Sequence, residues 1–502
     1  MNVLFFITDQ QRADHLGCAG NPILKTPNLD RLASEGVRFN SAYVANPVCM
    51  PNRCCIFTGL HANMCARAPG INLADDIPTF SETLHKAGYN TKCIGKMHIQ
   101  YWAAQLKEGV HSHEFGQEWF DKKTFAKKSE DFLKSLPYYG FSEADITMGH
   151  GDVMTGFYRS WLEERAPQYL PIIAKLAKKV LFNLHYKSPL PEEYYPTSYI
   201  TDRSIDFLER YSKGDLGEEP FFLFVSYPDP HHPVTPPGKW ADMYNPEDIE
   251  LPESFSDQDN VKEHKFFGKR LDHPLFRNMI LRTTNEEETR EFTARTYGVL
   301  SMIDNSVGQI LASLDKMGLA DNTIVIYTSD HGDMMGDHGL LLKGPLPFDG
   351  IYRIPMIWKV PGVAKPGSVT DSLISSVDFA PTILNLCNID KKDQPPDMQG
   401  FDMTPVLEDP KMKIRDRCLI ENDRATSEDP LGRLKTLVTE KYSLSVYAGI
   451  EDYGDLFDRK SDPMELNNLW FSNPELRHEL VEKLMFEMLR TQSLYPEKEA
   501  RT

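Results

Sequence analysis

The sequence predicts an α/β fold, in which helices flank a large, doubly wound and mostly parallel sheet, followed by a smaller C-terminal α+β domain that contains an antiparallel sheet. Two observations support this prediction. Strand-length apolar runs alternate with helical patterns along most of the chain, and a polar–apolar alternation appears near its end. With 502 residues, 41% of them hydrophobic, the chain is long enough to form one large domain and a smaller one.

Four near-continuous apolar runs have the length of strands, and polar residues follow each of them directly. These runs are residues 3–8, 91–95, 221–227 and 323–329. Runs of Val, Ile, Leu and Phe suit strands that are buried on both faces of a parallel sheet. Because ligands of such folds lie at the carboxyl ends of the strands, the polar residues that follow predict a site there. They are Asp9-Gln10, Lys96-Met97-His98, "PDPHHP" and Asp330-His331.

Helical patterns lie between these runs. The stretch "TPNLDRLASEGVRF" (26–39) opens with Thr26-Pro27, a typical helix start, and "FSETLHKAGY" (80–89) is also helical in pattern. The alternation of such segments with the apolar runs predicts the doubly wound arrangement.

The chain is expected to divide near residue 390. Residues 1–390 would form the α/β domain that carries the predicted site, with a helical insertion at about 150–200. Residues 391–502 would form the α+β subdomain, because "LKTLVTEKYSLSVYAG" alternates like strands and a helical pattern follows near 474–489.

Composition excludes several classes of function. The net charge is −18 and no basic face is evident, so we expect no nucleic-acid partner. No stretch approaches the roughly 18 apolar residues of a membrane span. The apolar run at the N-terminus is too short for a signal peptide and lacks a basic leader, so a cytoplasmic location is expected. Eight cysteines are an ordinary number for a chain of this length, and we expect their thiols to be mostly reduced.

Three cysteines lie within seven positions of the stretch "NPVCMPNRCCIFTG" (46–59), at Cys49, Cys54 and Cys55. From its residue type alone, each could be a redox group, a metal ligand, a buried small hydrophobe or a nucleophile. Cys54 and Cys55 fall on a predicted helix and are expected to be inert buried thiols. The residues after Cys49 suggest that it sits at a helix start, where free backbone N–H groups favour an anion.

The pattern C-x-P-x-R, from Cys49 to Arg53, resembles the signature of the sulfatase family. This family belongs to the alkaline phosphatase superfamily, in a branch that includes phosphonate monoester hydrolases. In the family this cysteine is oxidised after translation to formylglycine, an aldehyde. The resemblance therefore implies that Cys49 is the formylglycine precursor and that a formylglycine-generating enzyme is a partner during maturation.

Further segments resemble the family in the same order, from residue 2 to about residue 469. They are Asp9-Gln10, Asn72, Lys96 and His98 of "GKMH", His231 of "HHP", Asp330-His331, Lys343 and the tail "DLFDRKSDPMELNNL". Each segment alone would be read as ordinary surface or structural residues, but their joint occurrence indicates a functional site. Asp333, Asp337 and His338 lie in the same loop as Asp330; they receive no assigned role and are structural or substrate-side candidates.

The resemblance implies a role for each matched residue. The implied metal ligands are Asp9, Gln10, Cys49, Asp330 and His331. The implied catalytic residues are Cys49, Arg53, Lys96, His98, His231 and Lys343, and the implied substrate-binding residues are Asn72, Lys96, His231 and Lys343. Within this set, His98 would hold the hydrated aldehyde and His231 would protonate the leaving oxygen.

One divalent metal ion is the implied cofactor, with Ca²⁺ favoured and Mn²⁺ as the alternative. The ligands supply oxygens and one imidazole, which suit a hard ion. The family commonly has Asp where Gln10 stands, and many relatives carry Asn where His331 stands. Both departures are compatible with Ca²⁺.

The implied function is hydrolysis of sulfate esters through a covalent sulfo-enzyme intermediate, with a small anionic ester as substrate. An alternative is a phosphonate monoester or phosphodiester hydrolase with the same nucleophile, and a remote one is a non-catalytic relative that binds anionic esters. The helical insertion is the main reason to expect a homo-oligomer. The alcohol half of the substrate has no sequence signal.

Overall fold

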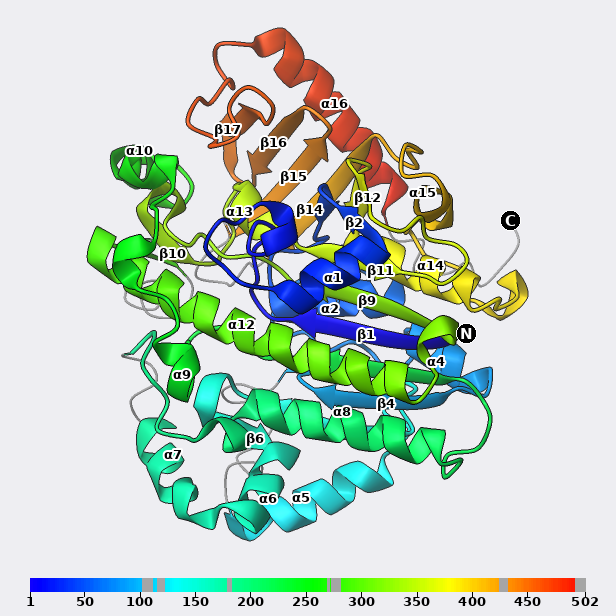
Figure 1. Ribbon diagram of the computed structural model, residues 1–502. Coiled ribbons are helices and arrows are strands. Elements are labelled where there is room, and N and C mark those ends of the chain that lie inside the picture. The colour runs from blue at the N-terminus through cyan, green and yellow to red at the C-terminus, as the bar shows by residue number, and fades with distance from the viewer. Residues whose placement is uncertain are drawn as a thin grey trace.

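The computed structural model describes residues 1–101, 112–114, 122–177, 183–268, 271, 281–423 and 432–492. Within these residues, a nine-stranded sheet forms the centre of the molecule (Figure 1). In spatial order its strands are β12 (Ser368–Thr370), β2 (Val37–Phe39), β11 (Met356–Lys359), β9 (Thr323–Ser329), β1 (Asn2–Thr8), β7 (Phe221–Ser226), β4 (Asn90–Gly95), β5 (Glu143–Met148) and β6 (Thr155–Gly156). Every pairing from β9 through β5 is parallel, whereas β11 and β6 run antiparallel to their neighbours. The predicted mostly parallel sheet is confirmed.

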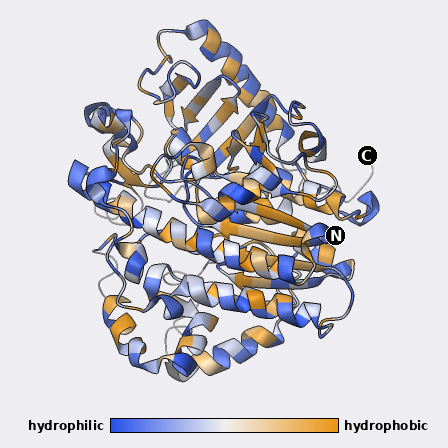
Figure 2. Cartoon of the chain, in the orientation of Figure 1, coloured by the Kyte–Doolittle hydropathy of each residue, from blue (hydrophilic) through white to orange (hydrophobic). Residues whose placement is uncertain are grey.

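The four predicted strands are β1, β4, β7 and β9, each within one residue of the expected bounds. All seven residues of β1 are buried, since successive side chains enter opposite cores. Phe5 belongs to one core, and Leu4 and Phe6 belong to the other. The central strands are accordingly mostly apolar (Figure 2).

Helices cover both faces of this sheet (Figure 1). One layer contains α1 (Pro27–Glu35), α8 (Pro196–Ser212) and α12 (Glu286–Lys316), and the other contains α2 (Cys49–Thr58), α4 (Phe80–Lys86) and α14 (Phe379–Leu386). The helix predicted over 26–39 starts as expected, with Thr26 as N-cap and Pro27 as its first residue. It ends earlier than expected because residues 37–39 form β2. At Gly36, between the two, a Cβ atom would collide with the carbonyl oxygen of Trp358 on β11.

The C-terminal strands form a separate antiparallel sheet, in the order β14 (Arg417–Asp423), β15 (Arg433–Thr439), β16 (Tyr442–Tyr447) and β17 (Ile450–Asp458). On one face, Leu419, Leu437 and Leu444 pack against α16 (Pro474–Arg490). On the other face, Ile420 and Val438 join the core of the large sheet. The predicted antiparallel sheet and terminal helix are confirmed, and the division near residue 390 stays a prediction.

The segment predicted as a helical insertion contains α6 (Phe157–Arg165) and α7 (Leu170–Ala177), and residues 178–182 of it lie outside the described residues. The other described elements are β3 (Ala42–Tyr43), α3 (Ala62–Cys65), α5 (Lys122–Lys134), α9 (Gly238–Ala241), α10 (Gln258–Glu263), β8 (Leu281–Thr283), β10 (Leu340–Leu342), α13 (Asp349–Tyr352), β13 (Ile374–Ser375) and α15 (Thr404–Glu408). None of the helices in the described ranges has the length and apolar content that crossing a membrane requires.

Candidate active site

Polar side chains from neighbouring parallel strands meet at the carboxyl edge of the sheet. The residues that follow these strands are Asp9 and Gln10 after β1, Asp330 and His331 after β9, Lys96 and His98 after β4, His231 after β7 and His150 after β5. Loop contacts join these strand ends, for example from the Asp9 amide to the Asp229 carbonyl at 3.2 Å. The position of the site agrees with the rule used to predict it.

Asp9 lies at the centre of a buried group of charges. Its Oδ2 accepts a hydrogen bond from Lys96 Nζ and lies 3.4 Å from His150 Nε2. Its Oδ1 lies 3.4 Å from His331 Nε2 and 3.9 Å from Lys343 Nζ. Burial alone would raise the pKa of Asp9, but Lys96 and the other nearby cations hold this pKa well below its ordinary value. Asp9 therefore carries its negative charge inside the protein.

Cys49 is the first residue of α2, as its sequence context predicted. Burial alone would raise the pKa of its thiol, but the ammonium groups of Lys343 and Lys96 lower that pKa well below the ordinary value. Lys343 Nζ lies 3.9 Å from Cys49 Sγ and 2.8 Å from His331 Nε2. His98 also faces this thiol, and burial lowers the pKa of His98 to about 4. The position of Cys49 is thus electropositive and suits a negatively charged nucleophile.

The C-x-P-x-R spacing places Arg53 one helical turn after Cys49, on the same side of α2. Arg53 is fully buried and donates through Nε to Asp330 Oδ2 at 2.7 Å. It also donates to the Lys96 carbonyl at 2.7 Å and to Ser226 Oγ at 2.9 Å. Asn52 of α2 adds a hydrogen bond of 2.6 Å to the Asp330 carbonyl. These contacts fix α2, and with it Cys49, to the ends of β9, β4 and β7.

Three histidine rings stack beside Asp9. The ring of His231 lies 3.6 Å from that of His150, at an interplanar angle of 7°, and 4.2 Å from that of His232. His231 donates through Nδ1 to the carbonyl of His232 at 2.5 Å. Burial and the neighbouring His150 lower the pKa of His231 well below its ordinary value. His231 is thus held as a neutral imidazole whose Nε2 is the remaining proton acceptor.

Sequence reasoning missed His150, which contacts both Asp9 and Lys96; its Nε2 lies 3.0 Å from Lys96 Nζ. The signal was present, because His150 follows the strand β5 in the way the other site residues follow theirs. The strand was not recognised because its sequence, "EADITM", mixes polar with apolar residues.

Asn72 lies beside the segment that follows His98. Its Oδ1 accepts a hydrogen bond of 2.8 Å from the Tyr101 amide, and the next residue, Leu73, donates to the Ile99 carbonyl at 3.0 Å. Its role in substrate binding stays a prediction.

The residues predicted as metal ligands form a donor set that fits a divalent ion. Ligand atoms of Asp9, Cys49, Asp330 and His331 all lie within 4.8 Å of one another, and all four residues are buried. Among the described residues, Asp9 Oδ1 and the buried Gln10 Oε1 have no hydrogen-bond partner. Such buried oxygens are costly unless they are satisfied, as a bound cation would satisfy them.

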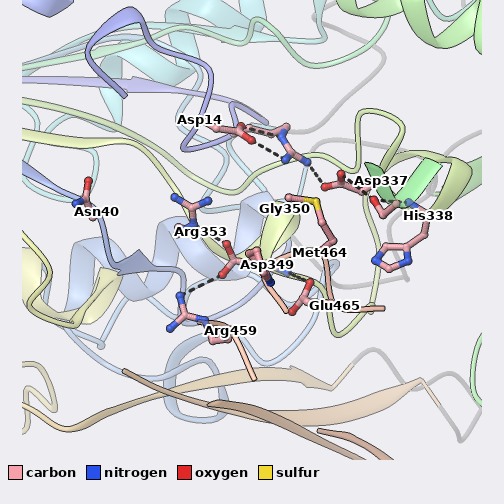
Figure 3. Close-up of a pocket in the computed structure, with 13 residues that line it drawn as sticks. Asp14, Asn40, Asp337, His338, Asp349, Gly350, Arg353, Arg459, Met464 and Glu465 are labelled. Carbon is pink, nitrogen blue, oxygen red and sulfur yellow. Dashed lines mark hydrogen bonds and ion pairs between the residues drawn. The ribbon is translucent and has the colours of Figure 1, made fainter. Parts of the chain in front are cut away.

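A polar cavity of about 260 Å³ lies at the same edge of the sheet, next to Arg12 (Figure 3). Its charges are largely paired with one another: Arg12 with Asp337 at 2.6 Å, and Arg353 with Asp349 at 2.5 Å. Arg12 also donates to the Asp333 carbonyl at 3.0 Å and so joins the loops that follow β1 and β9. This ion-pair network therefore links the loops that carry Asp9 and Asp330.

Comparison with known proteins agrees with the geometry. The Sulfatase family model matches residues 1–389, and that of the N-sulphoglucosamine sulphohydrolase C-terminal region matches residues 336–493. The chain is 30% identical over 483 residues to an arylsulfatase of Clostridium perfringens, covering 93% of this chain and 90% of the relative. It is 25% identical over 481 residues to a choline-sulfatase of Rhizobium meliloti, covering 93% and 82%.

Among solved structures, the phosphonate monoester hydrolase of Agrobacterium radiobacter has the same fold, with a TM-score of 0.79 at 23% identity over 99% of this chain and 97% of that one. The family match spans the large sheet and every residue of the buried cluster around Asp9 and Cys49. The chain therefore belongs to the sulfatase family of the alkaline phosphatase superfamily and is a sulfuric ester hydrolase.

Proposed function

We propose that the protein hydrolyses a small sulfate ester with formylglycine, formed from Cys49, as the nucleophile, and with one divalent metal ion. The observation that carries the proposal is the position of Cys49, at the start of α2 and within the buried cluster of Asp9, Asp330 and His331. A hydrated aldehyde at this position supplies two hydroxyl groups on one carbon, so that one can attack sulfur and the other can drive release of sulfate.

Asp9, Gln10, Asp330 and His331, together with residue 49, would hold the metal ion. Ca²⁺ is favoured and Mn²⁺ is the alternative, because three of these side chains offer oxygen and only one offers an imidazole nitrogen. When bound, the ion lowers the pKa of the attacking hydroxyl group and neutralises charge on a sulfate oxygen.

The side chains around Cys49 supply the remaining functions. Lys96 and Lys343 place positive charge beside the thiol position, where the sulfate oxygens would lie. His98 would hold the hydroxyl that is not used in the attack. His231 would act through Nε2, because its Nδ1 is engaged with the His232 carbonyl; as a neutral ring it would first have to accept at Nε2 the proton that it then gives to the leaving oxygen.

Phosphonate monoester or phosphodiester hydrolysis is the second candidate. The tetrahedral phosphonate group could use the same nucleophile and the same cations. The presence of Gln10 and His331, and the fold shared with the phosphonate monoester hydrolase, favour this activity as an alternative or as promiscuity. A non-catalytic, ester-binding role is disfavoured because Cys49 and each predicted ligand are chemically competent residues.

The first test is the mass of the proteolytic peptide that contains Cys49, from protein made together with a formylglycine-generating enzyme. Conversion replaces sulfur and two hydrogens with one oxygen, a loss of about 18 Da. The converted protein should then hydrolyse 4-nitrophenyl sulfate with a higher kcat/KM than the monoester 4-nitrophenyl phenylphosphonate. The reverse preference would make phosphonate hydrolysis the main activity. Sulfatase activity in protein whose Cys49 peptide is wholly unmodified would contradict the proposed nucleophile.

A further inference from the structure

The side chain of Gln10 has an unusual environment for an amide in the protein interior. Its Nε2 donates a hydrogen bond to Asp333 Oδ2 and lies 3.5 Å from His232 Nδ1. Its Oε1 is buried and has no hydrogen-bond partner among the described residues, and the Gln10 residue as a whole is only 2% exposed. Gln10 also has a left-handed backbone conformation, with φ at 73°. Its backbone N–H donates a hydrogen bond to Asp330 Oδ1 at 3.1 Å.

The partner of the amide decides which way the amide points. A carboxylate can only accept hydrogen bonds, so the Asp333 oxygen requires the NH₂ end of Gln10. A flipped amide would place the Gln10 oxygen against the Asp333 oxygen, which would be repulsive and would leave the NH₂ group unpaired. The contact with Asp333 thus forces Oε1 to the opposite side, away from Asp333.

Asp333 is itself firmly held. It is 1% exposed, and its Oδ1 accepts hydrogen bonds from the backbone amides of Met335 at 2.8 Å and Leu342 at 3.1 Å. Its carbonyl accepts a further bond from Arg12. With Oδ1 engaged in this way, Oδ2 is the oxygen that receives Gln10. Because Leu342 precedes Lys343, the same carboxylate joins the Gln10 loop to the segment that carries Lys343.

We propose that Asp333 is a positioning residue that orients the Gln10 side chain, so that Oε1 faces the metal site as a neutral ligand. The inference rests on the proposed function of Gln10 as a metal ligand. It assigns a task to a carboxylate that is not among the proposed metal ligands or substrate-binding residues. It also predicts that positions 10 and 333 are coupled: a carboxylate at position 10 is incompatible with the carboxylate of Asp333.

The test measures the affinity of Ca²⁺ alone, and of Mn²⁺ alone, by calorimetry on metal-stripped, unconverted protein. The set comprises the wild type, Gln10→Glu, Asp333→Asn and the double variant. Asp333→Asn should weaken metal binding by roughly ten- to a hundredfold, because Asn can face Gln10 with either end and no longer fixes the amide. In the Gln10→Glu background, the same Asp333→Asn change should strengthen binding, since an Asn NH₂ group then receives the Glu carboxylate. This reversal of sign is the signature of the proposed contact.

Asp14→Asn serves as the matched control, because Asp14 belongs to the Arg12 network but does not contact Gln10; its metal affinity should stay within about twofold of the wild type. If the wild type binds and Asp333→Asn binds equally well, the positioning role is wrong while the metal site stands. If Asp333→Asn weakens binding in both backgrounds, Asp333 supports the loop only, and the inference is overturned. If the wild type binds neither ion, the proposed metal site is wrong, and the inference falls with it.

Discussion

Replacing Arg53 by Met should destabilise the protein far more than replacing a surface arginine. The guanidinium group of Arg53 is fully buried, and so is its partner Asp330, 2.7 Å away. Met keeps much of the side-chain volume but leaves the Asp330 carboxylate, the Lys96 carbonyl and the Ser226 hydroxyl without this donor. Removing one partner of a buried ion pair costs about 3–5 kcal/mol, because the remaining charge stays desolvated.

Arg31→Met provides the control. Arg31 lies 3.8 Å from Asp315, with the two side chains 46% and 51% exposed, so the loss of this pair should cost no more than about 1 kcal/mol. Urea denaturation in the presence of a chelator, followed by tryptophan fluorescence, compares both variants with the wild type, and the chelator removes any contribution of bound metal.

A double-mutant cycle sharpens this comparison. In an Asp330→Asn background the buried negative charge is already absent, so Arg53→Met should cost less by about 2 kcal/mol or more. If the free energies of unfolding of Arg53→Met and Arg31→Met differ by less than about 1 kcal/mol, the reasoning is refuted. An equal cost in both backgrounds would also refute it.

Three further outcomes follow from the site. His231→Ala should lower kcat/KM about a hundredfold or more for alkyl sulfates but much less for 4-nitrophenyl sulfate, whose leaving group needs no proton; equal losses would contradict the role of His231 as the acid. Burial raises the pKa of Asp229 to about 7, so between about pH 4 and pH 7 the native state holds a proton here that the unfolded state releases, and the contribution of Asp229 to stability should fall as the pH rises. Asp229→Asn should flatten this fall in urea unfolding measured across that range, and an unchanged slope would argue against the raised pKa. In unconverted protein, iodoacetamide should label Cys49 in the native state, because lysines lower the pKa of its thiol, but should label Cys54 and Cys55 only after unfolding, because burial raises theirs. Peptide mass spectrometry reads out each site, and native labelling of Cys54 would show that α2 opens.

The central strands could be predicted because burial on both faces gives them a mostly apolar local sequence. A strand with both faces in a core, such as β1, consists almost entirely of apolar residues and is followed abruptly by polar ones. β2 has three residues and β5 mixes polar with apolar side chains, so neither stands out from its surroundings. The short strand β2 was included in a predicted helix for this reason.

The site likewise has features that the sequence predicts and contacts that it does not. Parallel strands have their carboxyl ends at one edge of the sheet, where ligands bind. This rule predicted that Asp9, Lys96 and Asp330 lie close together. The rule does not say which polar residues touch. The contact between Gln10 and Asp333 joins positions 323 residues apart, and that of Lys96 with His150 depends on a strand that had not been recognised. Such contacts follow from the packing of loops, which has no local sequence signal.

The burial of α2 has a consequence for how the protein is made. Every residue from Cys49 to Thr58 is buried, and the side chains of Asn52 and Arg53 lie entirely inside the protein. An enzyme that oxidises Cys49 needs access to this stretch, and the folded protein does not offer it. If Cys49 is oxidised to formylglycine as proposed, the oxidation would therefore have to precede the folding of this stretch. Under that proposal, the yield of active protein would depend on how fast the modifying enzyme acts relative to folding, and a chain that folds before modification would stay inactive.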